Sequence, residues 1–221
     1  MSDHTPDITH TPADASPQKT VDQSRRKLAG AAIGATAILT LASRPVLAGV
    51  CESPSAATSG NLSQHGTPIT CSGRSPGYWK EKPNKWPTTY DPGSCSNKCN
   101  KAKNWSAGTL FHPLFAGDNF FANVDGNPMT ITTSLSMMQI MHLNDGNNPW
   151  NLTDPDNLGA HIVAALLNAA AGLTPVLSES DVINMWREWD SQTYFEPVAG
   201  VEWSSKDIVD YIKSTFHVTE P

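Results

Sequence analysis

The chain is short of charged residues and of long apolar runs, and each shortage limits what it can be. Only 16% of its 221 residues are charged, and 21 acids against 15 bases give a net charge of −6. An acidic chain lacks the overall positive charge of a general nucleic-acid binder, so nucleic acid is not expected as a partner. The longest apolar run stops at Arg44 and Pro45, before the roughly 20 residues that a membrane-spanning helix needs. No stable membrane anchor is therefore expected.

Common catalytic motifs are also missing. The sequence has no Gly-x-Ser-x-Gly elbow, no His-Glu-x-x-His helix and no glycine-rich phosphate loop. Acids and histidines that could still assemble a site in space are Asp145, Asp154, Asp156, Glu188, Asp190, His112, His142 and His161. The first three of these acids could hold calcium, but they lack the regular spacing of an EF-hand. The sequence indicates no particular cofactor or metal, and it favours a non-enzymatic role over an enzyme.

Near the N-terminus, a pair of arginines precedes a moderately apolar segment. Residues Ser24–Leu28 read Ser-Arg-Arg-Lys-Leu, the apolar run follows, and Pro45–Ala48 supplies the small residues that a signal peptidase reads. This segment, with Arg25 and Arg26 at its centre, resembles a bacterial twin-arginine export signal. The resemblance implies passage through the twin-arginine translocase, cleavage after Ala48, and delivery to the periplasm, the cell surface or the medium. A general secretory signal is the alternative, while Val50 disfavours lipidation at Cys51.

Four cysteines, an even number, all lie in the first third of the mature chain: Cys51, Cys71, Cys95 and Cys99. In an exported protein such a set predicts disulfide bonds. We expect Cys71 to pair with Cys95 or Cys99 and Cys51 to take the remaining partner. The local alternative pairs Cys95 with Cys99 and Cys51 with Cys71. Structural zinc is a weaker interpretation, because it usually shows two close pairs of ligands.

The composition divides the chain into three parts. Residues 1–48 form the signal, residues 49–70 are rich in Ser, Ala, Thr and Gly and read as a flexible connector, and residues 71–221 form one domain. Within this domain, residues 71–127 carry Pro and Gly throughout and are expected to be loops held by disulfides. Residues 130–217 show helical patterns instead. The predicted fold class is mainly α, a small domain of about four helices.

Capping signals and apolar periodicity place these four helices. The first is expected after Thr133-Ser134, the second over Leu158–Ala171, the third after Ser178 and the fourth after Ser204. Because the second is apolar nearly all round, it should be the central buried helix, with Leu166 in the core. Its polar exceptions His161 and Asn168 share a face. They could form a site, but we favour buried groups that hold an adjacent loop by hydrogen bonds.

One short motif, at the start of the predicted domain, resembles a family signature. Residues Cys71–Lys80 end in Gly-Tyr-Trp-Lys, and Trp86-Pro87 follows shortly after. This pattern resembles a Cys…Gly-Tyr-Trp-Lys…Trp-Pro segment of exported and surface proteins of bacteria for which no activity is established. The resemblance implies an extracytoplasmic module and nothing about its chemistry.

Aromatic and basic residues interleave in this motif, and they are the candidate binding residues: Tyr78, Trp79, Lys80, Lys82, Lys85 and Trp86. Flat rings stack on sugars, and ammonium groups pair with carboxylates or phosphates, so the partner could be an anionic polymer of the cell envelope or another surface protein. The favoured alternative is that the aromatics fold inward as core while the lysines stay solvated.

Charge is unevenly divided along the mature chain. Most of the basic residues lie between Arg74 and Lys103, whereas acids dominate after Lys103.

Taken together, the sequence predicts an exported surface or periplasmic structural or binding module of unknown ligand. The alternative is a small hydrolase or metal-dependent enzyme that acts on envelope material. Convergence of His142, His161 and nearby acids in a cleft would favour the enzyme.

Overall fold

A computed structural model of the chain describes residues 51–59, 69–115, 121–122, 128–129, 135–146 and 148–217. The chain separates into two units, residues 1–40 and 41–221, and every described residue belongs to the second. The predicted export signal over residues 1–48 therefore lies outside the described residues. Among the described helices, none combines the length and the apolar composition that a membrane crossing requires.

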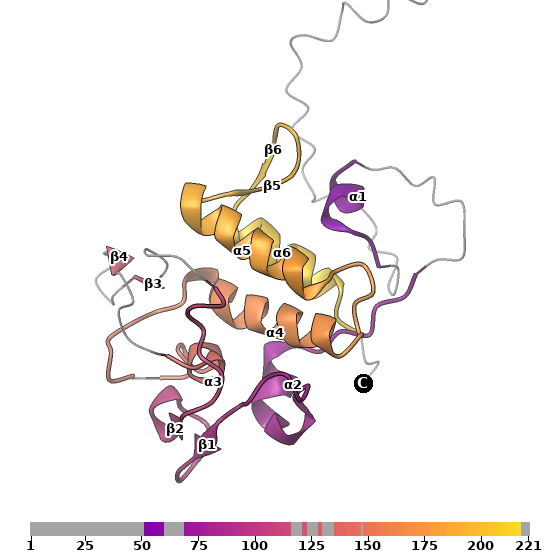
Figure 1. Ribbon diagram of the computed structural model, residues 1–221. Helices are drawn as coiled ribbons and strands as arrows, with labels where there is room; N and C mark the ends of the chain where they lie inside the picture. The colour runs from indigo at the N-terminus through magenta and orange to yellow at the C-terminus, as the bar shows by residue number, and fades with distance from the viewer. Residues whose placement is uncertain are drawn as a thin grey trace, which may run out of the picture. The chain divides into compact units, whose positions relative to one another are not determined.

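The central element is helix α4, Leu158–Ala170. It packs against α6 (Ser205–Ser214), α5 (Glu179–Gln192), α3 (Met137–Met141) and α2 (Pro76–Glu81). In Figure 1, α5 and α6 lie above α4, and α2 and α3 lie below it. Ten of its thirteen residues are buried, and Leu166 has no exposed surface. The predictions of a central helix and of a core position for Leu166 are confirmed.

The prediction of a mainly α fold is wrong, because the described residues form a mixed α/β structure. They hold six α-helices instead of about four, together with three two-stranded antiparallel sheets. These sheets pair β1 (Ser94–Cys95) with β2 (Trp105–Ser106), β3 (Phe121–Ala122) with β4 (Pro128–Met129), and β5 (Phe195–Val198) with β6 (Val201–Trp203). The hairpin of β5 and β6 turns at Ala199-Gly200, and Gly200 has a φ of +80°. A glycine suits this turn because only glycine adopts positive φ freely.

Capping boxes fix the helix starts that the sequence predicted. In α5 the Ser178 hydroxyl accepts from the Asp181 N–H and the Asp181 carboxylate accepts from the Ser178 N–H, and Ser204 and Asp207 repeat this arrangement in α6. In α3 the capping residue is Ser136, with Gln139 as its partner. Thr133-Ser134, where the first helix was expected to start, lies outside the described residues. Each box satisfies two N–H groups that a helix start leaves open.

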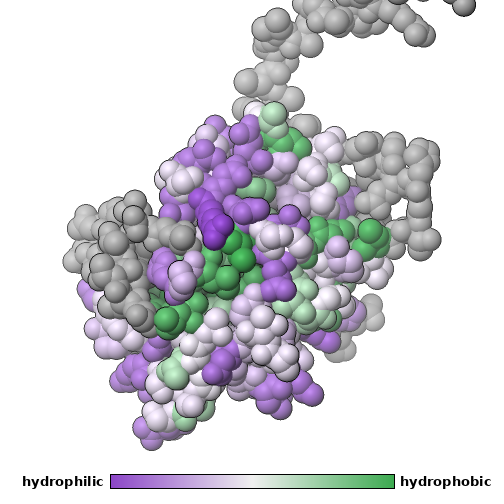
Figure 2. Space-filling model, in the orientation of Figure 1, coloured by the Kyte–Doolittle hydropathy of each residue, from purple (hydrophilic) through white to green (hydrophobic). Residues whose placement is uncertain are grey.

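Large aromatic side chains fill the space between α4 and the loop-rich segment that precedes it. Trp79 on α2 is 2% exposed, and Trp86, Tyr90 and Trp105 are also buried. The Trp86 indole donates to the Trp79 carbonyl at 3.0 Å. A segment with so little regular structure needs these rings as its core, as the inward-folding alternative predicted. On the face shown in Figure 2, hydrophilic and intermediate residues cover most of the described surface and hydrophobic ones gather between them.

The four cysteines form two disulfides, each between cysteines that are consecutive in the sequence. Cys51 pairs with Cys71 and Cys95 pairs with Cys99. The prediction of disulfides is confirmed, but the expected long-range pairing of Cys71 with Cys95 or Cys99 is wrong. A backbone hydrogen bond from Cys51 N to Ile69 O, 2.7 Å long, holds Cys51 beside Cys71.

Part of the predicted flexible connector forms a helix. Residues Pro54–Ser59 form α1, which packs against β5, and the Tyr211 hydroxyl donates to the Glu52 carbonyl at 2.8 Å. Residues 60–68 of the connector lie outside the described residues. Composition could not reveal α1, because its stability comes from the disulfide and from packing on residues far along the chain.

The end of the chain returns to the start of the domain at Gly73. The Gly73 N–H donates to the Thr215 carbonyl at 3.1 Å, and the His217 N–H donates to the Gly73 carbonyl at 2.8 Å. A side chain at Gly73 would place its Cβ 2.8 Å from the Thr215 oxygen and 3.0 Å from Nδ2 of Asn168. Only glycine fits where the two backbones approach so closely.

We therefore expect Gly73→Ala to lower the free energy of unfolding by about 1–3 kcal/mol, because the Thr215 backbone must move. Gly77→Ala is the matched control, since its Cβ would meet only the Ser75 hydroxyl at 3.6 Å, inside a helix. That change should be neutral or slightly stabilising. Urea denaturation of both variants measures the difference, and equal stability of the two would contradict the close approach at Gly73.

Candidate functional site

A cleft of about 720 Å³ opens between α2, the β1–β2 pair and the C-terminal end of α3. Its lining combines charged, polar and apolar groups: Gly77, Lys80, Glu81, Pro83, Gly93, Cys95, Cys99, Asn100, Trp105, His142 and Asp145. The volume falls within the range of small-molecule binding sites. The Cys95–Cys99 disulfide forms part of one wall, so a covalent link fixes the shape of that wall.

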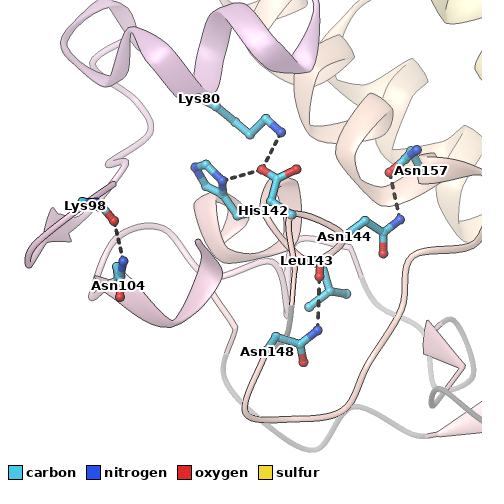
Figure 3. Close-up of polar contacts among 9 residues, drawn as sticks. Lys80, Lys98, Asn104, His142, Leu143, Asn144, Asn148 and Asn157 are labelled. Carbon is cyan, nitrogen blue, oxygen red and sulfur yellow. Dashed lines mark hydrogen bonds and ion pairs between the residues drawn. The ribbon is translucent and has the colours of Figure 1, made fainter. Parts of the chain in front are cut away.

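Two side chains, one charged and one titratable, converge on one carboxylate in the cleft. Asp145 Oδ2 lies 2.7 Å from Lys80 Nζ and 2.7 Å from His142 Nδ1. Figure 3 shows the Lys80 amine and the His142 ring, which come from α2 and from the residue directly after α3. This contact joins positions 65 residues apart and connects the loop-rich segment to the helical part of the domain.

The geometry fixes the protonation of this group. The hydrogen bonds from Lys80 and His142 hold the pKa of Asp145 below its ordinary value, against the opposing effect of burial. Burial lowers the pKa of His142, and the hydrogen bond to Asp145 only partly offsets this. The imidazole is therefore neutral near pH 7. Because Asp145 is ionised, Nδ1 carries the proton and donates it, and Nε2 is left as a hydrogen-bond acceptor.

Two buried nitrogen atoms in the lining have no hydrogen-bond partner within the described part of the chain: Nε2 of His142 and Nε1 of Trp105. Both side chains are 4% exposed. Their rings stack with centroids 6.1 Å apart and planes inclined by 21°. The Trp105 backbone is in turn fixed by Gln139, whose side-chain amide donates to its carbonyl at 2.9 Å. In Figure 3 the second ring nitrogen of His142 points away from the carboxylate that holds the first.

Exposed lysines lie close in sequence to residues of the lining. Lys82, Lys85, Lys98 and Lys101 are exposed, and each lies within two residues of a residue of the lining. We call these four lysines the basic rim. No ion pair joins any of them to an acid within the described residues. Of the two acids in the lining, Asp145 is paired with Lys80 and Glu81 is exposed, so the four lysines outnumber the acid that remains.

The candidate binding residues predicted from the sequence separate into three groups. Trp79 and Trp86 are buried and offer no ring face to a ligand, which removes them from the expected binding surface. Lys80 lines the cleft, and Lys82 and Lys85 belong to the basic rim. Tyr78 is half-buried beneath the Arg74 guanidinium, whose carbon lies 5.0 Å from the ring centroid.

The other candidate residues do not join this site. His161 bonds through Nδ1 to the Asn157 carbonyl at 2.7 Å and stacks on Phe216. Asp154 is buried and accepts from the Gly159 and Ala160 N–H groups, so it caps α4, and burial raises its pKa to about 7. In the part of the chain that the structure describes, no three His, Cys, Asp or Glu side chains come together to hold a metal ion.

Asn168 is confirmed in the role that the sequence favoured. It is fully buried, and its Oδ1 accepts from the Arg74 N–H at 2.8 Å and from the Trp79 indole at 3.1 Å. Its amide group donates to the Arg74 carbonyl at 3.0 Å. These bonds hold the start of α2 against α4, and α2 carries Lys80 into the cleft.

Sequence reasoning missed Trp105 as a residue of the site, and it named His142 and Asp145 only as scattered candidates. Their spacing of three residues at the end of a predicted helix was a signal, because residues so spaced are neighbours on a helical turn. Nothing in the sequence indicated that Trp105 would stack on His142.

The charge arrangement makes a prediction for the pKa of His142. Lys80 lowers this pKa and Asp145 raises it. Lys80→Met should therefore raise the pKa of His142 and Asp145→Asn should lower it further below 6.5. An NMR titration of the imidazole resonances measures both shifts, and shifts of the same sign in the two variants would contradict the arrangement.

Comparison with known proteins gives no match: no protein-family model, no curated protein and no solved structure is significantly similar to this chain. The function is therefore argued from the cleft itself.

Proposed function

We propose that the chain is an exported binding module, non-catalytic, whose cleft holds a segment of an anionic polymer of the cell envelope. The observation that carries this proposal is the basic rim, four exposed lysines without ion-pair partners in the described part of the chain, each within two residues of the lining of a cleft of about 720 Å³. Repeated negative charges along a polymer can contact several of these lysines at once while one unit enters the cleft.

The chemistry of the lining supports binding over catalysis. It offers no serine or threonine hydroxyl, and both of its cysteines are joined in a disulfide. The described residues also bring no metal-binding set together. His142 and Asp145 alone do not make the nucleophile, base and oxyanion donors that acyl transfer requires.

Binding is tested with polygalacturonate, a polymer with one carboxylate on each sugar, by calorimetry at low and at physiological salt. We expect binding that weakens with salt, because exposed charges are screened. Lys82→Glu with Lys85→Glu should weaken it by about tenfold or more, since like charges then face the ligand. Lys213→Glu on α6, which replaces an exposed lysine that lines no part of the cleft, is the control. The proposal fails if the unchanged chain does not bind, or if the control weakens binding as strongly as the rim variant does.

Export is the second part of the proposal. It rests on the paired arginines Arg25 and Arg26 in the sequence, and the two disulfides are typical of proteins that leave the reducing cytoplasm. Of the bacterial export pathways, the twin-arginine translocase is the one that recognises such a pair.

Replacing both arginines by lysine should therefore leave the precursor, uncleaved, in the cytoplasm. The cell fractions are separated and the chain is detected with an antibody. Arg44→Lys, in the same leader but outside the pair, should leave export unchanged. Normal export of the Arg25→Lys, Arg26→Lys variant would show that the pair is not the signal.

A further inference from the structure

The two disulfides of the chain lie in opposite environments. Cys51 and Cys71 are 1% and 7% exposed, whereas Cys95 is half-buried and Cys99 is exposed. The Cys95–Cys99 disulfide also lines the cleft. A thiolate that attacks a disulfide must reach one of its sulfur atoms, so access decides which disulfide exchanges. Of the two disulfides, Cys95–Cys99 is the one that offers this access.

A structural role explains the buried disulfide better than the exposed one. The members of the buried pair are 20 positions apart in the sequence, and those of the exposed pair are four apart. In the chain-entropy model, the stabilisation from a cross-link grows with the length of chain that it closes. The exposed disulfide therefore contributes the less to the stability of the fold, although it lies in the wall of the cleft.

Other contacts hold the two ends of the segment that the exposed disulfide closes. The pairing of β1 with β2 does not depend on the disulfide, and the Ser96 N–H donates to the Asn104 carbonyl at 2.9 Å. The Asn104 N–H in turn donates to the Lys101 carbonyl at 3.1 Å. We therefore expect the domain to stay folded when this disulfide is open, so that the disulfide can form again.

The sequence around the exposed disulfide carries positive charge. Lys98 directly precedes Cys99, Lys101 follows two residues later, and no acid occurs between Asp91 and Asp118. Ammonium groups favour the thiolate over the thiol, and a thiolate is both the attacking and the leaving group of thiol–disulfide exchange. The local charge therefore favours exchange at this position.

We infer that the Cys95–Cys99 disulfide is a site of thiol–disulfide exchange with a dithiol, and that its reduction frees one wall of the cleft. A thiolate of the dithiol attacks Sγ of Cys99, the more exposed residue of the pair. The bond between the two Sγ atoms breaks, and Cys95 leaves as a thiolate and takes up a proton. The second thiol of the dithiol then loses its proton and attacks the mixed disulfide, and Cys99 leaves and is protonated. The dithiol becomes a cyclic disulfide, and two electrons have passed to the protein.

Reduction acts on the cleft through residues 97–100. Of these, Cys99 and Asn100 line the cleft and Lys98 belongs to the basic rim. Without the disulfide, a bond from the Asn104 amide to the Lys98 carbonyl still holds them, but this bond is exposed and competes with water. A ligand must then order this segment when it binds. Binding of polygalacturonate should therefore weaken by about three- to tenfold, the cost of ordering one or two long side chains. This effect rests on the proposed function.

The exchange itself is tested on the folded chain with dithiothreitol, followed by alkylation of free thiols and peptide mass spectrometry. We expect Cys95 and Cys99 to be labelled together, at least about tenfold faster than Cys51 and Cys71, because the buried pair reacts only when the structure opens. In urea, where both pairs are accessible, the rates should become similar. Equal rates in the folded chain, or faster labelling of the buried pair, would overturn the exchange site.

The effect on the cleft is tested by calorimetry with polygalacturonate, at the dithiothreitol concentration that reduces Cys95 and Cys99 alone. Cys95→Ser with Cys99→Ser is the matched variant without the disulfide. It should bind as weakly as the reduced chain and should not respond to dithiothreitol. Thermal unfolding shows that the variant is folded, and the reduced chain gives the same comparison without any substitution.

The outcomes separate this inference from the function on which its second part rests. Equal affinity of the oxidised and reduced chains would overturn the freeing of the wall and leave anionic binding in place. Failure of the oxidised chain to bind at low salt would overturn the proposed function together with the effect of reduction on binding. The labelling experiment needs no ligand, so it decides the exchange site in either case.

Discussion

Replacing Asn168 by leucine should lower the free energy of unfolding by about 3–5 kcal/mol. The side chains are similar in size, but leucine leaves the Arg74 N–H, the Arg74 carbonyl and the Trp79 indole without their partner. Each unsatisfied buried group costs roughly 1–3 kcal/mol, and the three costs are not fully additive because the bonds share one residue. Urea denaturation followed by tryptophan fluorescence measures the loss.

The exposed Asn84 provides the control for this prediction. Asn84→Ala should change stability by no more than about 0.5 kcal/mol, as surface substitutions usually do. Because Asn168 holds α2 in place, Asn168→Leu should also weaken ligand binding in molecules that remain folded. A loss of stability below about 1 kcal/mol would show that Asn168 does not carry the contact between α2 and α4.

Replacing Leu166 by alanine should cost about 2–5 kcal/mol, the usual cost of a large-to-small change in a well-packed core. Leu166 has no exposed surface and lies on α4, which contacts α2, α3, α5 and α6. Leu166→Asp should prevent folding altogether, because an isolated carboxylate would be buried without a partner.

The companion substitution for this site is Leu166→Met, which conserves volume and should cost less than about 1.5 kcal/mol. Thermal unfolding compares the Leu166→Ala and Leu166→Met variants with the unchanged chain. If Leu166→Ala were as stable as Leu166→Met, α4 would not be the centre of the core.

Local features of the fold could be predicted from the sequence because local physics determines them. The capping boxes at Ser178 and Ser204 need only a hydroxyl and an acid three residues later. The apolar composition of α4 similarly predicted its burial. The β5–β6 hairpin was missed because its strands are short and only partly buried, so alternation of apolar residues is weak in them.

Features that depend on distant contacts could not be predicted. The pairing of Cys51 with Cys71 depends on the backbone contact between Cys51 and Ile69 and on the packing of α1 against β5. The cleft depends on Lys80 meeting Asp145 across 65 residues of sequence. Interleaved aromatics and lysines suggested a binding surface, but the sequence alone could not tell that Trp79 and Trp86 point inward while Trp105 lines a cleft.

The most direct test of the central claim is an NMR titration of the chain with oligogalacturonate, followed through the backbone amides and the tryptophan indole N–H signals. The account predicts that the Trp105 indole signal shifts strongly, together with the amides of Gly77 and Asn100 in the lining. The indole signal of Trp203, outside the cleft, should stay in place. Shifts confined to α5, α6 and the β5–β6 hairpin, or no shifts at saturating ligand, would contradict the assignment of this cleft as the binding site.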